Sequence, residues 1–174
     1  NPSSLASCCR VLNEIQDNTF SSINGLQGVM TGSCNVITLN INRIVQDWFQ
    51  SIGGVYPIDR LNTEFRQYLI SILDRVYKYH IAYKTMLYEW EAKGMYASSN
   101  GDYIRIKNLY STVGINGLNE AAEFLGLEVS NNPEYIEFLQ LILGTIKEQN
   151  KIHSIQNKKQ PFLFNSEVVP AEGL

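Results

Sequence analysis

The fold is decided by one stretch of the sequence, Leu109-Tyr110-Ser111-Thr112-Val113-Gly114-Ile115-Asn116-Gly117-Leu118. Residues 109–113 are predicted to form a short strand, residues 114–117 a glycine-bearing turn, and residues 118–125 a helix. A strand, a turn and a helix in this order are typical of an α/β unit. The stretch therefore predicts an α/β fold.

The residues after this unit continue the alternation of strand and helix. Asn132 is suited to cap a helix and Pro133 to its first position, so a helix is predicted from there towards Ile155. Pro161 interrupts this pattern, and residues 162–169 are predicted to form a strand. Residues 109–174 thus consist of successive strand and helix units.

The residues before the unit predict a further strand and a long helix. Polar and apolar residues alternate from Val36 to Ile41, which indicates a strand with one apolar face and one polar face suited to an active site. A short helix is predicted over 45–48. A long amphipathic helix is predicted over 59–93, because apolar residues recur there at spacings of three and four. Long connections disfavour antiparallel pairing, so the pattern predicts consecutive βα units of a larger barrel or open sheet.

The composition is that of a single globular domain. The chain has 174 residues, of which 44% are hydrophobic and 18% are charged, and these values exclude a disordered or fibrous protein. The net charge is -3 and no dense patch of Lys and Arg is present, so we expect no nucleic-acid partner.

Targeting and membrane signals are absent from the sequence. No run approaches the roughly 18 apolar residues of a membrane span, and the first residues lack the pattern of a signal peptide. We therefore expect a soluble, cytoplasmic protein with no membrane partner. Asn1 is not a natural start, and the chain stops at Leu174 directly after a strand-like run, so we expect a piece of a longer protein.

All three cysteines lie in the first forty residues, and two of them are adjacent. Cys8, Cys9 and Cys34 cannot all pair, and a bridge between neighbours is strained, so we expect reduced thiols in a reducing compartment. Arg10 favours a thiolate, and the polar, loop-like sequence offers little burial. The residues alone predict redox or nucleophilic thiols at a loop tip beside a sheet, with a small buried hydrophobe as the alternative for each cysteine.

Other sites of chemistry are not indicated. The sequence has no phosphate-binding glycine motif, no nucleophile elbow and no zinc-protease motif. The cysteines lack zinc spacing and the two histidines lie on separate predicted helices, so no metal site is expected. His80 is predicted to be buried and hydrogen-bonded to a neighbour, His153 to lie at the surface, and Trp90 to lie in the core.

Four segments resemble the anaerobic (class III) ribonucleoside-triphosphate reductases. They are Ser7-Cys8-Cys9-Arg10, Thr31-Gly32-Ser33 with Val36 to Ile44, Ser111 to Glu120, and Pro170-Ala171-Glu172-Gly173. The segments follow the family's order and span nearly the whole chain. The resemblance implies a glycyl-radical enzyme with a ten-stranded α/β barrel, in which residues 1–44 form a finger loop and the following strand. Residues 59–93 and 109–174 are then parts of the second half-barrel.

The resemblance also implies a reaction and its residues. A thiyl radical abstracts the ribose 3'-hydrogen, the 2'-hydroxyl leaves as water, and a reductant completes the deoxyribonucleotide. Cys9 matches the thiyl-radical cysteine, and Cys8 matches a neighbouring cysteine of some subtypes. Asn116 and Gly117 lie at a strand-to-helix junction that suits substrate contacts.

Two further segments are compared with the family in the same way. Residues Pro170, Ala171, Glu172 and Gly173 resemble a loop that meets the substrate phosphates, with a structural turn as the alternative. Formate-using members carry an asparagine close to Ser33, where this chain has Ser33 and Cys34. Cys34 is either an additional redox thiol or a buried strand residue.

The implied cofactor and partners lie largely outside the sequence. The glycyl radical is expected from a C-terminal region absent here, installed by an iron-sulfur S-adenosylmethionine activase, and no cofactor is expected on this chain itself. Expected partners are a ribonucleoside triphosphate, the activase, the remainder of the reductase and a second copy in a homodimer. The chain alone is not expected to turn over. The alternatives are an enzyme of the pyruvate formate-lyase type, which the match over 114–120 disfavours, and a non-catalytic split-gene or remnant module.

Overall fold

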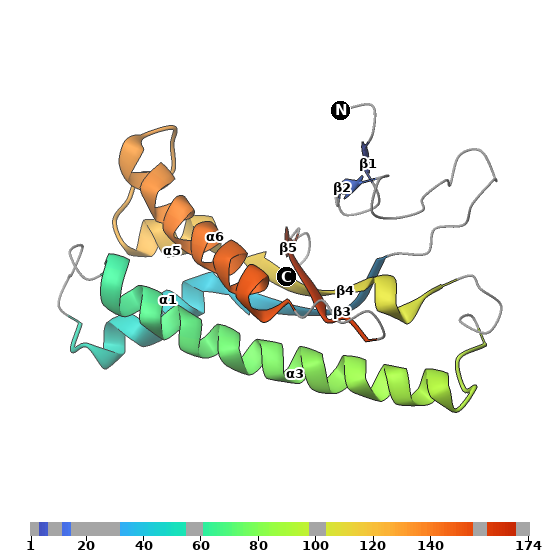
Figure 1. Cartoon of the computed structure of the whole chain (residues 1–174). Helices are drawn as coiled ribbons and strands as arrows, with labels where there is room; N and C mark the ends of the chain where they lie inside the picture. The colour runs from blue at the N-terminus through green and yellow to red at the C-terminus, as the bar shows by residue number, and fades with distance from the viewer. Residues whose placement is uncertain are drawn as a thin grey trace.

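The computed structural model describes residues 4–6, 12–14, 32–54, 61–97, 104–154 and 160–169. Its centre is a three-stranded parallel sheet in the order β3-β4-β5, formed by β3 (Gly32–Asn40), β4 (Leu109–Asn116) and β5 (Leu163–Val168) (Figure 1). A separate antiparallel pair is formed by β1 (Ser4–Ala6) and β2 (Leu12–Glu14). The predicted mixed α/β fold with parallel pairing is confirmed, while closure into a ten-stranded barrel stays a prediction.

The helices follow the strands as the sequence pattern predicts. They are α1 (Ile41–Ser51), the π-helical turn η2 (Leu61–Phe65), α3 (Arg66–Ala92), the 3-10 turn η3 (Ile106–Asn108), α5 (Leu118–Phe124) and α6 (Pro133–His153). α6 begins as expected, because the Asn132 side chain accepts a hydrogen bond from the Tyr135 N–H at 2.8 Å. The Asn40 side chain caps α1 in the same way, accepting from the Arg43 N–H at 3.0 Å.

Three predicted elements are longer in the structure than in the sequence pattern. β3 begins at Gly32 instead of Val36, β4 runs on to Asn116, and α1 starts directly after β3 at Ile41. The early part of β3 contains glycine and serine, which have low strand propensity, but its backbone pairs with β4 from Gly32↔Leu109 onward. Pairing with a neighbouring strand overrides the local preference there.

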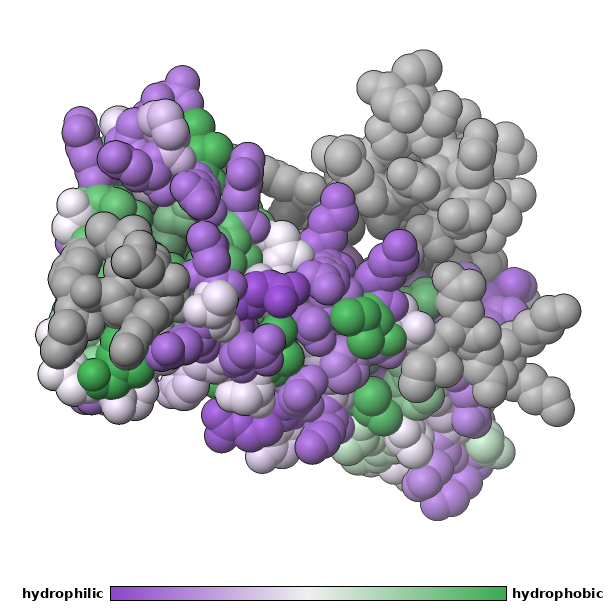
Figure 2. All heavy atoms as spheres, turned by 60° about the vertical axis from the view of Figure 1, so that its left-hand side comes forward, coloured by the Kyte–Doolittle hydropathy of each residue, from purple (hydrophilic) through white to green (hydrophobic). Residues whose placement is uncertain are grey.

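One face of the sheet is covered by helices. The apolar side chains of the strands pack against α3 and α6 in a single core cluster that includes Leu39, Val113, Ile115 and Phe164. α3 and α6 also pack against each other, and α1 packs against α5. On the side of the molecule shown in Figure 2, hydrophilic residues predominate and the hydrophobic ones form small separate groups. No helix among the described residues is both long and apolar enough to cross a membrane.

α3 is longer than the strands on which it packs (Figure 1). At about 1.5 Å per residue its 27 residues span about 40 Å, so its last turns lie beyond the sheet. Trp90 is in these turns and is 38% exposed, and the prediction that it lies in the core is therefore wrong. His80 is fully buried as predicted, but among the described residues neither ring nitrogen has a partner at hydrogen-bond geometry, which corrects the expected bond to a neighbour. Burial lowers the pKa of His80, and the nearby Thr112 backbone opposes this shift.

Lys84 is a charged group buried under the beginning of β4. Its Nζ donates a hydrogen bond to the Leu109 carbonyl oxygen and lies 5.8 Å from the centre of the Tyr88 ring. Burial lowers the pKa of Lys84 to about 8, and Cys34 nearby partly opposes this shift. The ammonium form is therefore disfavoured in the folded protein relative to the unfolded chain.

This burial predicts a stability that increases with pH. Between pH 8 and 10.5 the unfolded chain binds more protons at Lys84 than the folded protein does, so the free energy of unfolding rises with pH in that window. Burial raises the pKa of Tyr77 and Tyr88, which reverses the trend above about pH 10. From pH 7.5 to 9.5 we expect an increase on the order of 1–2 kcal/mol in urea unfolding.

The comparison that tests this expectation is Lys84→Met, which should remove the increase. Lys78→Met, at an exposed position of the same helix, should retain it. An equal slope in Lys84→Met and in the parent protein would show that Lys84 is not its source.

Candidate functional site

The face of the sheet opposite the helices carries polar side chains. We call this surface the polar sheet face and define it by Ser33, Thr38, Asn40, Thr112, Gly114, Asn116, Asn165 and Glu167. Residues paired in register point to the same face of a sheet. Thr38 pairs with Gly114 and Gly114 with Glu167, so these three residues form one row across all three strands. Thr38 and Asn40 are exposed. The predicted separation of Ile37 and Leu39 from Thr38 and Asn40 is confirmed, whereas the exposed Val36 pairs with Thr112 on the polar sheet face and Ile41 belongs to α1.

A chain of hydrogen bonds crosses the polar sheet face. Ser33 Oγ lies 2.7 Å from Thr112 Oγ1, and Thr112 Oγ1 donates to Asn165 Oδ1 at 2.7 Å. We call these three residues the three-strand relay, since each comes from a different strand. Thr112 is buried, Asn165 is half-buried and Ser33 is exposed. The relay was not predicted from the sequence, although a threonine inside a buried strand is a signal that a polar partner lies beside it.

Gly114 is the central residue of the row Thr38, Gly114 and Glu167, and neighbouring side chains lie close to its backbone. A Cβ atom at this position would lie 2.5 Å from Thr38 Oγ1 and 2.9 Å from Val169 Cγ2. Neither distance is compatible with a side chain, so the position requires glycine. The absence of a Cβ allows the side chains of β3 and of the end of β5 to close over the central strand.

The junction between β4 and α5 holds two of the predicted substrate-contacting residues. Gly117 has a φ of +75° and the half-buried Asn116 precedes it. The Gly117 N–H donates to the Asn116 side-chain oxygen at 2.7 Å, so this backbone donor is already occupied. The Asn40 side chain lies next to Gly117, which brings the ends of β3 and β4 together. The substrate role of Asn116 and Gly117 stays a prediction.

Cys34 lies on the helix-covered side of the sheet. It packs against a small cluster of Leu87, Tyr88 and Ile106, and its Sγ is 3.7 Å from Ser111 Oγ. Strict alternation from Ile37 would place Cys34 on the polar sheet face. A register shift between Ser33 and Asn35 turns it to the other side and puts Ser33 on the polar face instead. The structure does not bring Cys34 together with the polar sheet face.

The remaining predicted site residues, Cys8, Cys9, Pro170, Ala171, Glu172 and Gly173, lie outside the described residues. Among the described residues, no group of three or more His, Cys, Asp or Glu side chains is placed to hold a metal ion.

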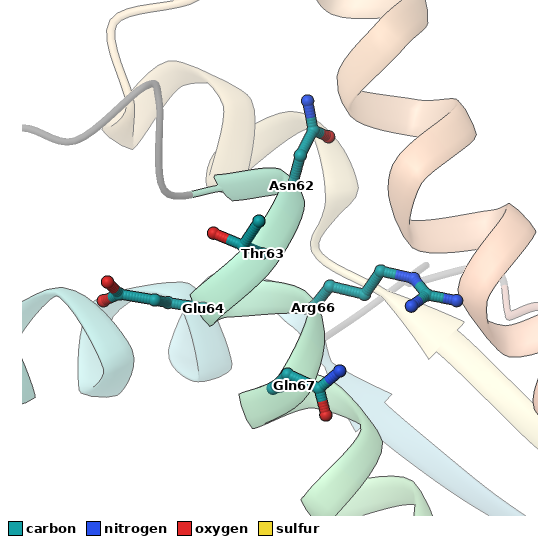
Figure 3. Close-up of a pocket in the computed structure, with 5 residues that line it drawn as sticks. All are labelled: Asn62, Thr63, Glu64, Arg66 and Gln67. Atoms are coloured by element: carbon teal, nitrogen blue, oxygen red, sulfur yellow. The ribbon is translucent and has the colours of Figure 1, made fainter.

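An open hollow of about 520 Å³ lies at the start of α3 (Figure 3). It is lined by Asn62, Thr63, Glu64, Arg66 and Gln67. Arg66 extends from it towards α6, where its Nη2 atom pairs with Glu148 Oε2 at 2.6 Å. None of the residues of the polar sheet face lines this hollow, so the two surfaces are separate features of the molecule.

Comparison with known proteins identifies similar sequences and structures. The family model for anaerobic ribonucleoside-triphosphate reductase matches residues 1–174. A crystal structure of the anaerobic ribonucleotide reductase from Thermotoga maritima with citrate in the active site has a TM-score of 0.66 and 26% identity, covering 82% of this chain and 25% of that chain. The same enzyme in complex with dATP and CTP matches with a TM-score of 0.66 and 24% identity, covering 86% of this chain and 25% of that chain. No curated protein matches. The chain spans about a quarter of the length of these structures.

Proposed function

The chain belongs to the anaerobic ribonucleoside-triphosphate reductase family, and from this premise we propose that it forms part of the catalytic domain of an enzyme that reduces ribonucleoside triphosphates to 2'-deoxyribonucleoside triphosphates. The family match over residues 1–174 carries the proposal. The three parallel strands with helices on one face and polar groups on the other support it. In a complete ten-stranded barrel the helices lie outside and the polar sheet face lines the interior.

The chemistry requires a thiol that exchanges one hydrogen atom with the ribose. We assign this role to Cys9, whose thiyl radical takes the 3'-hydrogen and later returns a hydrogen atom to the same carbon. Between these steps the 2'-hydroxyl leaves as water, and a reductant supplies two electrons. Cys8 is proposed as a neighbouring redox thiol. The glycyl radical, when present, generates the thiyl radical, and the sequence of this chain lacks the family's glycyl-radical motif.

The substrate is proposed to lie between the finger loop and the polar sheet face. β4 and β5 are neighbouring parallel strands, so their carboxyl ends meet at one edge of the sheet. Asn116 and Gly117 lie at this end of β4, and residues 170–173 come after β5 in the chain. Residues 170–173 are proposed to meet the phosphates. An activase that installs the radical, a homodimeric assembly and a cytoplasmic location complete the proposal.

The decisive experiment uses the complete protein activated without oxygen. Treatment with its radical S-adenosylmethionine activase should give a glycyl radical detectable by electron paramagnetic resonance. Addition of ribonucleoside triphosphates with formate or a dithiol reductant should then yield deoxyribonucleotides, measured by chromatography. A protein that carries the radical but forms no deoxyribonucleotide with either reductant contradicts the proposal. Formation of acetyl groups from pyruvate instead would indicate the acyl-transfer chemistry of the pyruvate formate-lyase type.

A further inference from the structure

The direction of the three-strand relay follows from its last hydrogen bond, in which Asn165 Oδ1 is the acceptor. The hydroxyl of Thr112 carries one proton and donates it to Asn165 Oδ1. The contact between Ser33 Oγ and Thr112 Oγ1, at 2.7 Å, then takes the Ser33 proton, which Ser33 shares with the Asn35 carbonyl oxygen at 3.1 Å. Both donations run from β3 towards β5, and the relay ends on the side-chain oxygen of Asn165.

This arrangement fixes the orientation of the Asn165 carboxamide. Its oxygen is engaged by the buried Thr112 hydroxyl, so the two N–H donors of the amide point away from Thr112. Asn165 is half-buried and belongs to the polar sheet face, which the helices do not cover. The structure therefore holds a pair of hydrogen-bond donors in a defined direction on the surface proposed to contain the substrate.

The surroundings of Asn165 favour a neutral acceptor over a charged one. Glu167 is two positions along the same strand on the same face, about 7 Å away along β5. None of the residues that define the polar sheet face is cationic. Within the described part of this face, a phosphate would be repelled by the Glu167 carboxylate, whereas an uncharged oxygen would not.

We infer that Asn165 is a substrate-binding residue that donates an N–H to a ribose hydroxyl oxygen of the nucleotide, and that Thr112 and Ser33 are positioning residues that hold its amide in that orientation. This inference rests on the proposed function. In this inference the three-strand relay contributes to binding of the ribose, while other residues bind the phosphates.

The test measures KM and kcat of the complete, activated protein with a ribonucleoside triphosphate. Asn165→Asp keeps the shape and the acceptor for Thr112 but removes both N–H donors. We expect KM to rise about tenfold, the loss of one hydrogen bond with an unpaired partner, while kcat changes little. Thr112→Val should raise KM less, because the amide is then free to rotate, and Thr112→Ser should restore the parental value. Asn62→Asp, in η2 before the start of α3, is the matched control and should leave KM unchanged.

A binding measurement separates recognition from turnover. Equilibrium binding to the complete protein before activation is compared for a ribonucleotide and for its 2'-deoxy and 3'-deoxy analogues. One of the two analogues lacks the hydroxyl that Asn165 contacts. That analogue should bind to Asn165→Asp as tightly as it binds to the parent protein. If Asn165→Asp does not fold in a thermal-unfolding check, Asn165→Ser replaces it in both experiments.

The outcomes distinguish this inference from the proposed function. A parent protein that forms deoxyribonucleotides, together with unchanged KM and unchanged analogue discrimination in Asn165→Asp, overturns the inference and leaves the function intact. A KM that rises equally in Thr112→Val and Thr112→Ser also overturns the positioning role, because a hydroxyl at residue 112 would then not matter. A parent that forms no deoxyribonucleotide removes the proposed function and the inference with it.

Discussion

Serine in place of Cys9 is expected to abolish ribonucleotide reduction by the complete, activated enzyme. The reaction as proposed needs a side chain that gives up and takes back a hydrogen atom, and the S–H bond of a thiol is weak enough for this exchange. The O–H bond of serine is much stronger, so the hydroxyl does not form the radical although it has nearly the same shape. Deoxyribonucleotide formation should fall below detection.

The glycyl radical is the internal control for this variant. Its signal in electron paramagnetic resonance should be equal in the parent protein and in Cys9→Ser, which shows that the variant is folded and activated. Cys8→Ser is the matched variant at the adjacent position, and it should retain hydrogen exchange at the ribose even if the overall reduction slows. Deoxyribonucleotide formation by Cys9→Ser with an intact glycyl radical would mean that another residue is the thiyl site.

Alanine in place of Gly114 is expected to destabilise the sheet by about 1–3 kcal/mol, as overpacking does in well-packed interiors. The new Cβ would meet Thr38 Oγ1 at 2.5 Å, Val169 Cγ2 at 2.9 Å and the Thr38 Cα at 3.1 Å. The last of these is a backbone atom, so a side-chain rotation does not relieve every contact. Urea or thermal unfolding measures the loss.

The chain offers a matched glycine for comparison. Gly144 is an exposed position of α6, and a Cβ there meets no atom within 4 Å. Gly144→Ala should therefore stabilise the protein by up to about 1 kcal/mol through higher helix propensity. Thr38→Ala combined with Gly114→Ala should recover part of the loss, since it removes the nearest atom. Equal effects of the two alanine substitutions would contradict the close packing at Gly114.

The parts of the fold that were predictable are those with a local signal. Alternation over 37–40, the cap at Asn132 and the strand, turn and helix around Gly117 each depend on a few adjacent residues, and each is present in the structure. Trp90 was misplaced because helical periodicity shows which face a residue lies on but not where the neighbouring sheet ends. That no described residue forms a hydrogen bond with the His80 ring depends on the packing of α3 under β4, which is a property of the tertiary structure.

The candidate site was less predictable because it combines distant segments. Ser33, Thr112 and Asn165 are 79 and 53 residues apart along the chain, and only the order β3-β4-β5 makes them neighbours. The orientation of Cys34 depends on a register shift that no local pattern reveals. The assignments to Cys9 and to residues 170–173 depend on family resemblance, and they await the experiments described above.

The register shift at the start of β3 makes Cys34 the one residue of the strand that the pairing with β4 does not need. Loss of Cys34 would restore simple alternation, keep the Ser33 hydroxyl on the polar sheet face and leave the rest of the strand in its present pairing. A single-codon deletion is thus enough to remove the thiol from the helix-covered side without turning any downstream side chain to the other face.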